Sequence, residues 1–90
     1  MANDDLKNFS SLVEIMKRLR APEGCPWDLE QNHRTLMPFA IEEVYELAEA
    51  VEAGDFDGMR EELGDLLLQV VFHAEVARQE NHFSIDDVIK

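Results

Sequence analysis

Apolar residues recur at three- and four-residue spacing along most of the chain, which is typical of amphipathic α-helices. The first such stretch covers residues 5–20, and Asn3 or Asp4 is expected to cap it. Its apolar stripe consists of Leu6, Phe9, Leu12, Val13, Met16 and Leu19. Residues 21–26, which contain two prolines and a glycine, end this helix. No segment shows strand-like alternation, so the pattern predicts an all-α fold.

Two longer helices are expected after a loop at residues 27–36 that has room for one short turn. The first should run over residues 38–53, because Pro38 is tolerated in a first helical turn. The second should run over residues 59–80. The connection at residues 54–58 is short, so the two helices are predicted to pack as an antiparallel hairpin at the centre of a helical bundle.

The last residues carry one more helix-start pattern. Ser84 is followed three positions later by Asp87, but the chain stops at Lys90, barely one turn on. Either a further helix is cut short here or the chain is a fragment of a longer protein. Ninety residues make a single domain, residues 1–90.

The second long helix is apolar around most of its circumference. One face consists of Leu63, Leu66, Leu67, Val70, Ala74 and Ala77, and the rest is largely covered by Leu68, Val71, Phe72 and Val76. A chain of this length cannot bury such a helix on all sides. We therefore expect assembly into a homodimer, a tetramer or another oligomer.

The composition of the chain excludes some classes of function and indicates its cellular compartment. The net charge is −12, from 20 acidic and 8 basic residues, which argues against binding a nucleic-acid polymer. The single cysteine, Cys25, cannot form an internal disulfide, which fits a reducing compartment. The N-terminus lacks the features of a secretory signal, and no apolar run is long enough to span a membrane. The sequence therefore predicts a cytoplasmic protein.

One acidic pattern occurs twice, once on each long helix. Residues 41–47 read Ile-Glu-Glu-Val-Tyr-Glu-Leu, and residues 60–66 read Arg-Glu-Glu-Leu-Gly-Asp-Leu. The repeated carboxylates, offset by 19 positions, are Glu42, Glu43 and Glu46 on the first helix and Glu61, Glu62 and Asp65 on the second. Glu46 and Asp65 are symmetric about the turn, so we expect them to face each other. Glu43 and Glu62 should then lie one turn away on either side.

Without a bound cation, such a cluster of acids destabilises the helices that carry it. Residues 35–59 contain seven acids and no lysine or arginine. Like charges three or four positions apart destabilise a helix by roughly 0.2–0.5 kcal/mol per pair. Oxygen-only ligands favour Mg²⁺, with Mn²⁺ as an alternative. The competing interpretation is a solvated acidic face without metal. A di-iron site is disfavoured, since the only Glu-x-x-His pair, Glu30 and His33, lies in the expected loop.

These residues resemble the MazG-type, all-α nucleoside triphosphate pyrophosphohydrolases. The shared motifs are Glu43-x-x-Glu46 followed by Glu62-x-x-Asp65, the segment at residues 24–28, the step Gln31-x-His33, and residues 61–73. The resemblance covers the chain from about residue 12 to residue 89.

The resemblance implies a dimerising helical bundle that needs Mg²⁺ and cleaves a nucleoside triphosphate between its α and β phosphates. The implied metal ligands are Glu43, Glu46, Glu62 and Asp65. Glu42 and Glu61 would be supporting carboxylates, one of which orients or deprotonates the attacking water.

Substrate contacts are less defined. Arg34 and Arg60 are the basic residues nearest the pattern in sequence, and ordinary surface charge explains them equally well. Trp27 has the chemistry to stack on a base or to anchor its loop against the bundle. The favoured function is a hydrolase that clears non-canonical or surplus nucleotides. The alternative is a catalytically weak, nucleotide-binding oligomerisation module that needs a C-terminal part or a partner, and a third is a metal-free acidic interaction domain.

Overall fold

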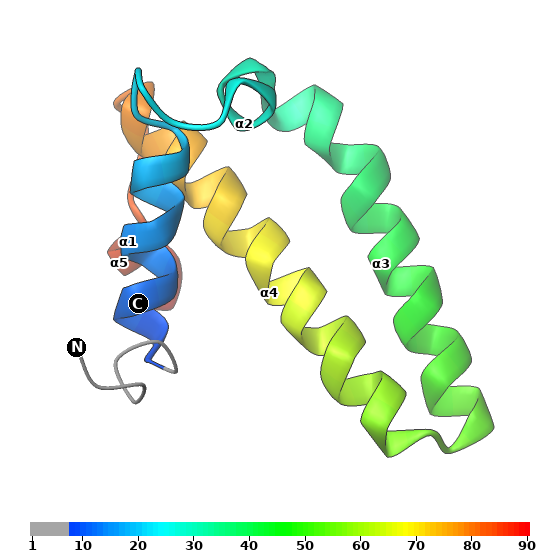
Figure 1. The fold of residues 1–90 in the computed structure, drawn as a ribbon. Coiled ribbons are helices and arrows are strands. Elements are labelled where there is room, and N and C mark those ends of the chain that lie inside the picture. The colour runs from blue at the N-terminus through cyan, green and yellow to red at the C-terminus, as the bar shows by residue number, and fades with distance from the viewer. Residues whose placement is uncertain (1–7) are drawn as a thin grey trace.

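The computed structural model describes residues 8–90, and all regular structure within that range is α-helical, as predicted. The elements are α1 (Phe9–Leu19), α2 (Pro26–Glu30), α3 (His33–Ala53), α4 (Phe56–Gln79) and α5 (Ile85–Ile89). Figure 1 shows α3 and α4 as a long antiparallel hairpin, with α1 beside the C-terminal half of α4.

The hairpin turn is shorter than we expected. Only Gly54 and Asp55 connect α3 to α4, so α4 begins three residues before the predicted Met59. Gly54 adopts the left-handed conformation (φ 67°), which a glycine tolerates at a helix C-terminus. Asp55 caps α4, because its Oδ1 accepts a hydrogen bond of 3.0 Å from the backbone N–H of Gly58. The prediction that residues 54–58 form the connection was therefore wrong.

Helix α3 also starts earlier than predicted, at His33 instead of Pro38. A reciprocal cap fixes this start: the Thr35 N–H donates to Asn32 Oδ1 (3.0 Å), and the Asn32 N–H donates to Thr35 Oγ1 (2.8 Å). The cap satisfies backbone donors that would otherwise be unpaired at the helix end. The expected loop at residues 27–36 consequently shrinks to α2 and a two-residue junction.

The core lies where α1 and the start of α3 pack on the second half of α4. It consists of Met16, Leu36, Val71, Phe72 and Val76, all at most 3% exposed. Helix α1 begins at Phe9 after an extended Asn8. The predicted start at residue 5, with its caps Asn3 and Asp4, lies outside the described residues. The start of α5 agrees with the prediction, since the Ser84 N–H donates to Asp87 Oδ2 (2.9 Å).

Arg20 joins three helices at the top of the hairpin. Its Nε donates to Gln79 Oε1 (2.7 Å), at the end of α4. Its Nη1 donates to the carbonyl oxygens of Asp28 (2.6 Å) and Gln31 (2.9 Å), and its guanidinium lies 5.8 Å from the centre of the Phe72 ring. Arg20 thereby fixes α2 and the α2–α3 junction relative to α4, and it is not free to bind phosphate.

The rest of the hairpin leaves apolar side chains uncovered. The most exposed along one side are Met37, Val44 and Val51 of α3 and Leu63, Leu67 and Val70 of α4, each at least 40% exposed. We call these six residues the apolar face. A single chain thus does not bury α4 all round. None of the described helices is long and apolar enough to cross a membrane.

Candidate metal centre

Three of the predicted carboxylates converge across the hairpin. Glu43 of α3 and Glu62 and Asp65 of α4 each offer one oxygen atom, and these three atoms lie within 4.8 Å of one another. Glu43 and Glu62 are half-buried, and Asp65 is exposed. Carboxylates converging from two helices at this separation can share one bound cation.

Glu46 joins this cluster in a different way from the predicted one. We expected Glu46 opposite Asp65, with Glu43 one turn away. Instead Glu43 shares the three-carboxylate group with Glu62 and Asp65, while Glu46 lies close enough to raise the pKa of both Glu43 and Glu62. The difference follows from the short turn, because a connection of only Gly54 and Asp55 shifts the register of α4 against α3.

The environment of the cluster disfavours negative charge. Partial burial, followed by the charges of Glu46, Asp65 and Glu42, raises the pKa of the Glu43 carboxyl above its usual value. Partial burial and the charge of Glu46 raise the pKa of Glu62 to about 7. Among the described residues, no lysine or arginine forms an ion pair with either carboxyl. The carboxylates therefore repel each other without compensation from the chain.

One carboxylate oxygen of the cluster also lacks a hydrogen-bond partner among the described residues. The Oε2 atom of Glu43 is buried and accepts no hydrogen bond from the part of the chain that the structure describes. A buried carboxylate oxygen without a partner is costly. A divalent cation bound by the cluster would satisfy this atom and offset the repulsion. The all-oxygen donor set fits a hard cation such as Mg²⁺.

The remaining predicted carboxylates flank the cluster. Glu42 and Glu61 are both exposed, each next in sequence to a member of the cluster. The charge of Glu42 contributes to the raised pKa of Glu43, so it acts within electrostatic range. Both side chains are free to contact a ligand bound over the cluster.

Neither predicted arginine is brought to the cluster within one chain. Arg34 precedes Glu43 by nine positions, which places it roughly 180° away around the axis of α3. Arg60 lies roughly 160° from Glu62 around α4. Its Nη1 contacts Asp57 Oδ1 at 3.2 Å, and both of these side chains are mostly exposed.

An aromatic group lies on the same side of the hairpin as the carboxylates. Trp27 of α2 meets Phe39 edge-on with ring centroids 5.8 Å apart, and Phe72 with centroids 6.4 Å apart. Phe39 precedes Glu43 by one helical turn, so the two share a face of α3. Trp27 anchors α2 against the bundle, yet it remains 50% exposed. The sequence did not lead us to place Phe39 or Phe72 beside the site, although the four-residue spacing from Phe39 to Glu43 was a usable signal.

No histidine joins the carboxylate cluster in the described residues. His33 of α3 instead contacts His73 of α4, with their Nδ1 atoms 2.7 Å apart. Glu30 and His33, the pair weighed for a di-iron site, are thus not arranged around the carboxylates. The histidine pair was not anticipated from the sequence, because its members lie 40 positions apart.

Comparisons with known proteins identify the family of this chain. The model of the MazG nucleotide pyrophosphohydrolase domain matches residues 31–90. The nucleoside triphosphate pyrophosphohydrolase/pyrophosphatase MazG of Thermotoga maritima is 57% identical over 82 residues, which cover 91% of this chain and 32% of that protein. The nucleoside triphosphate pyrophosphohydrolase of Escherichia coli K12 is 49% identical over 84 residues, 92% of this chain and 32% of the relative. The chain thus spans about a third of the length of these relatives.

The raised pKa of Glu62 predicts how the stability of the metal-free protein depends on pH. In the unfolded chain this carboxyl loses its proton near its ordinary pKa of about 4.3. In the folded protein it keeps the proton until about pH 7. The folded state therefore binds more protons in this window, and the free energy of unfolding should fall as pH rises through it.

The measurement is the melting temperature in EDTA between pH 5 and 8, for the wild type and Glu62→Gln. The difference between the two removes the contribution of His73, whose lowered pKa gives a slope of the opposite sign. We expect Glu62→Gln to gain most over the wild type at pH 8, and the exposed neighbour variant Glu61→Gln to gain little. Parallel curves for Glu62→Gln and the wild type would contradict the assigned burial and repulsion.

Divalent cations should stabilise the folded chain through the same cluster. At a free Mg²⁺ concentration ten times the dissociation constant, the gain would be about 1.4 kcal/mol. For a domain of this size that corresponds to a rise in melting temperature of roughly 5–10 °C. Glu43→Gln should lose most of this rise. Sodium chloride at matched ionic strength is the control, and an equal rise with it would reduce the cluster to a solvated acidic face.

Proposed function

Because the chain belongs to the MazG nucleotide pyrophosphohydrolase family, we propose that it hydrolyses nucleoside triphosphates to the monophosphate and pyrophosphate, with Mg²⁺ as cofactor. The observation that carries this proposal is the convergence of Glu43, Glu62 and Asp65, with which no lysine or arginine of residues 8–90 forms an ion pair. A triphosphate carries about four negative charges, so these carboxylates alone would repel it. A site of this kind suits an anionic substrate only when metal ions lie between the two.

The proposed metal ligands are Glu43, Glu46, Glu62 and Asp65. The buried Oε2 of Glu43 and the proximity of Glu46 to both Glu43 and Glu62 support this set. When bound, Mg²⁺ would neutralise phosphate charge and stabilise the charge that develops during phosphoryl transfer. Mn²⁺ would be accepted as a substitute, since it favours similar oxygen ligands.

Glu42 and Glu61 are proposed to act on the attacking water. Both carboxylates are exposed and border the metal ligands, one on each helix. A carboxylate outside the set of metal ligands can accept a hydrogen bond from a water molecule and take its proton. The geometry leaves both residues open for this role.

Trp27 is proposed to support the nucleobase. Its ring is held edge-on by Phe39 and Phe72 while half of its surface stays accessible, and Phe39 lies one helical turn from Glu43. Stacking on an aromatic ring tolerates any base, so this contact would add affinity with little base preference. Arg34 and Arg60 lie on other faces of their helices. They are therefore candidate phosphate contacts only across a subunit interface.

The apolar face supports the proposal of a homo-oligomer. Its six side chains belong to both helices of the hairpin and carry no charge. Contiguous apolar surface of this extent is typical of an interaction site. A second copy presenting the same face would bury both hairpins in a four-helix arrangement with twofold symmetry.

Hydrolysis of a panel of nucleoside triphosphates, with and without Mg²⁺, tests the activity. Pyrophosphate and orthophosphate are measured separately. We expect Mg²⁺-dependent pyrophosphate release, and a loss of at least about 100-fold in Glu46→Gln, because even residues behind metal ligands cost 10–100-fold. Glu49→Gln, on the same helix but outside the repeated pattern, is the matched control. Mg²⁺ binding without turnover of any substrate would favour the nucleotide-binding module instead.

Sedimentation tests the oligomer. The chain mass is 10.3 kDa, and we expect a species of at least twice that mass. Val44→Asp should shift the equilibrium toward the monomer, since a charge on the apolar face would be buried unpaired. Ile15→Asp, at a similarly exposed position of α1, is the control. A wild-type monomer at micromolar concentration would remove the proposal.

A further inference from the structure

The contact between His33 and His73 is a hydrogen bond between coplanar rings. The two Nδ1 atoms are 2.7 Å apart, whereas the ring centroids are 5.0 Å apart, and the ring planes differ by only 6°. Rings that were stacked face to face could not place two edge atoms so much closer than their centres. The imidazoles therefore meet edge to edge, with an N–H of one ring directed at the lone pair of the other.

The surroundings select the direction of this bond. Oε1 of Glu80, at the end of α4, lies 3.9 Å from Nε2 of His33. A carboxylate there favours a proton on His33 Nε2, which leaves His33 Nδ1 as the acceptor. His73 Nδ1 is then the donor, and His73 Nε2 carries a lone pair. That atom is buried, and its lone pair accepts no hydrogen bond from the described residues.

The bond survives one added proton but not two. A pair with a single proton between the two Nδ1 atoms still has one donor and one acceptor. With both imidazoles protonated, two N–H groups and two positive charges would face each other at 2.7 Å. In the arrangement above, the lone pair outside the bond is on His73 Nε2, so the first added proton goes there, and the proton between the two Nδ1 atoms can then lie on either ring. Burial, and then the charge of His33, lower the pKa of His73.

Few other charges act on the pair. Among the described residues Glu80 is the only side chain within ion-pair distance of His33. From α1, Arg20 approaches the neighbouring Phe72 but is bonded to Gln79 and to the carbonyl oxygens of Asp28 and Gln31. From α5 and the residues before it, the side chains that line the groove beside His73 are the apolar Val88 and Phe83. Glu80 is therefore the charged side chain nearest the pair among those named here.

The pair holds the part of α3 that leads into the candidate site. His33 is the first residue of α3 and directly follows the junction after α2, which carries Trp27. Arg20 holds this junction through the Gln31 carbonyl, and the histidine pair ties the first turn of α3 to α4. We propose that His33 and His73 are positioning residues that hold the α2–α3 junction and Trp27 beside the carboxylates, and that they release it when both imidazoles are protonated.

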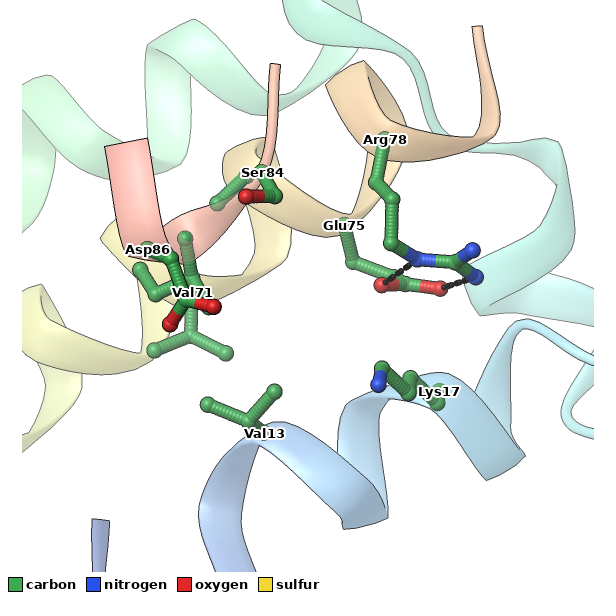
Figure 2. A pocket seen from close by; sticks show the side chains of 9 residues that line it. Val13, Lys17, Val71, Glu75, Arg78, Ser84 and Asp86 are labelled. Carbon is green, nitrogen blue, oxygen red and sulfur yellow. Dashed lines mark hydrogen bonds and ion pairs between the residues drawn. The ribbon is translucent and has the colours of Figure 1, made fainter. Parts of the chain in front are cut away.

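A second groove at this end of the bundle holds a charged pair. Figure 2 shows the pocket between α1, α4 and α5, where both oxygens of the buried Glu75 carboxylate accept hydrogen bonds from Arg78 (2.8 and 2.6 Å). Those hydrogen bonds raise the pKa of Arg78, so its guanidinium keeps its charge between pH 7 and pH 5. The proposed release therefore does not involve the charge of Arg78.

Histidine-selective ¹⁵N NMR on the wild type tests the bond directly. We expect a scalar coupling between the two Nδ1 nuclei at pH 7.5 that disappears on acidification. The pKa of His73 should lie below the ordinary value of about 6.5. Absence of the coupling at pH 7.5, or its persistence at pH 5, would overturn the proposal. This measurement needs no variant and no substrate.

Fluorescence tests the effect on the site, since Trp27 is the only tryptophan in the chain. In the wild type we expect its emission to shift to longer wavelength between pH 7.5 and pH 5. The double variant His33→Phe/His73→Phe keeps an edge-on ring pair without titratable atoms, and it should lose the shift. His82→Asn is the matched control and should retain it. A shift that persists in the double variant would show that another group, such as Glu62, causes it.

The consequence for nucleotide binding rests on the proposed function, whereas the two spectroscopic tests do not. In the wild type KM should rise several-fold between pH 7.5 and pH 5.5 beyond any change in kcat, and in the double variant it should not. Equal pH dependence of KM in both proteins would remove the positioning role. No turnover at any pH, with the coupling present, would count against the proposed function alone.

Discussion

Repulsion between carboxylates on α3 and α4 is the constraint on which the rest of the structure depends. Glu43, Glu46, Glu62 and Asp65 meet in the middle of the hairpin, and the raised pKa values of Glu43 and Glu62 record the resulting cost. The helices stay together because they are held at both ends. At one end the two-residue turn closes the hairpin, and at the other the core around Leu36 and Phe72 packs against α1. A sequence selected for stability alone would not place four acids between these two attachments.

The two sides of the hairpin carry different kinds of side chain. On one side the carboxylates adjoin the aromatic group of Trp27, Phe39 and Phe72. On the other lies the apolar face, which includes Val44 of α3 and Leu63 of α4. Because an α-helix turns about 100° per residue, neighbouring positions such as Glu43 and Val44 lie on different sides of the hairpin. Binding of a metal nucleotide and association with a second copy therefore need not compete for surface.

The sequence was sufficient for the helices and for the identity of the carboxylates, because both follow from local periodicity. It was not sufficient for the register between α3 and α4. The register depends on whether the turn has two residues or five, and Gly54 with Asp55 competed with Gly58 as the end of the connection. The start of α3 was misplaced because Pro38 was given more weight than the reciprocal cap of Asn32 and Thr35. Contacts such as Trp27 with Phe72, or His33 with His73, join distant positions and have no local signal.

The positions of the arginines limit how a triphosphate can be held. Arg20 is committed to Gln79, Asp28 and Gln31, and Arg34 and Arg60 point away from the carboxylates on their own helices. With a net charge of −12, the chain repels a free nucleotide before contact is made. Positive charge must therefore arrive with the metal, with a second copy of the chain, or with both. A nucleotide that enters already complexed with Mg²⁺ meets less repulsion than the free anion, and it brings the cation to the atoms that lack one, above all the buried Oε2 of Glu43. The same acids that repel each other across the hairpin would thus favour the metal-bound form of the proposed substrate.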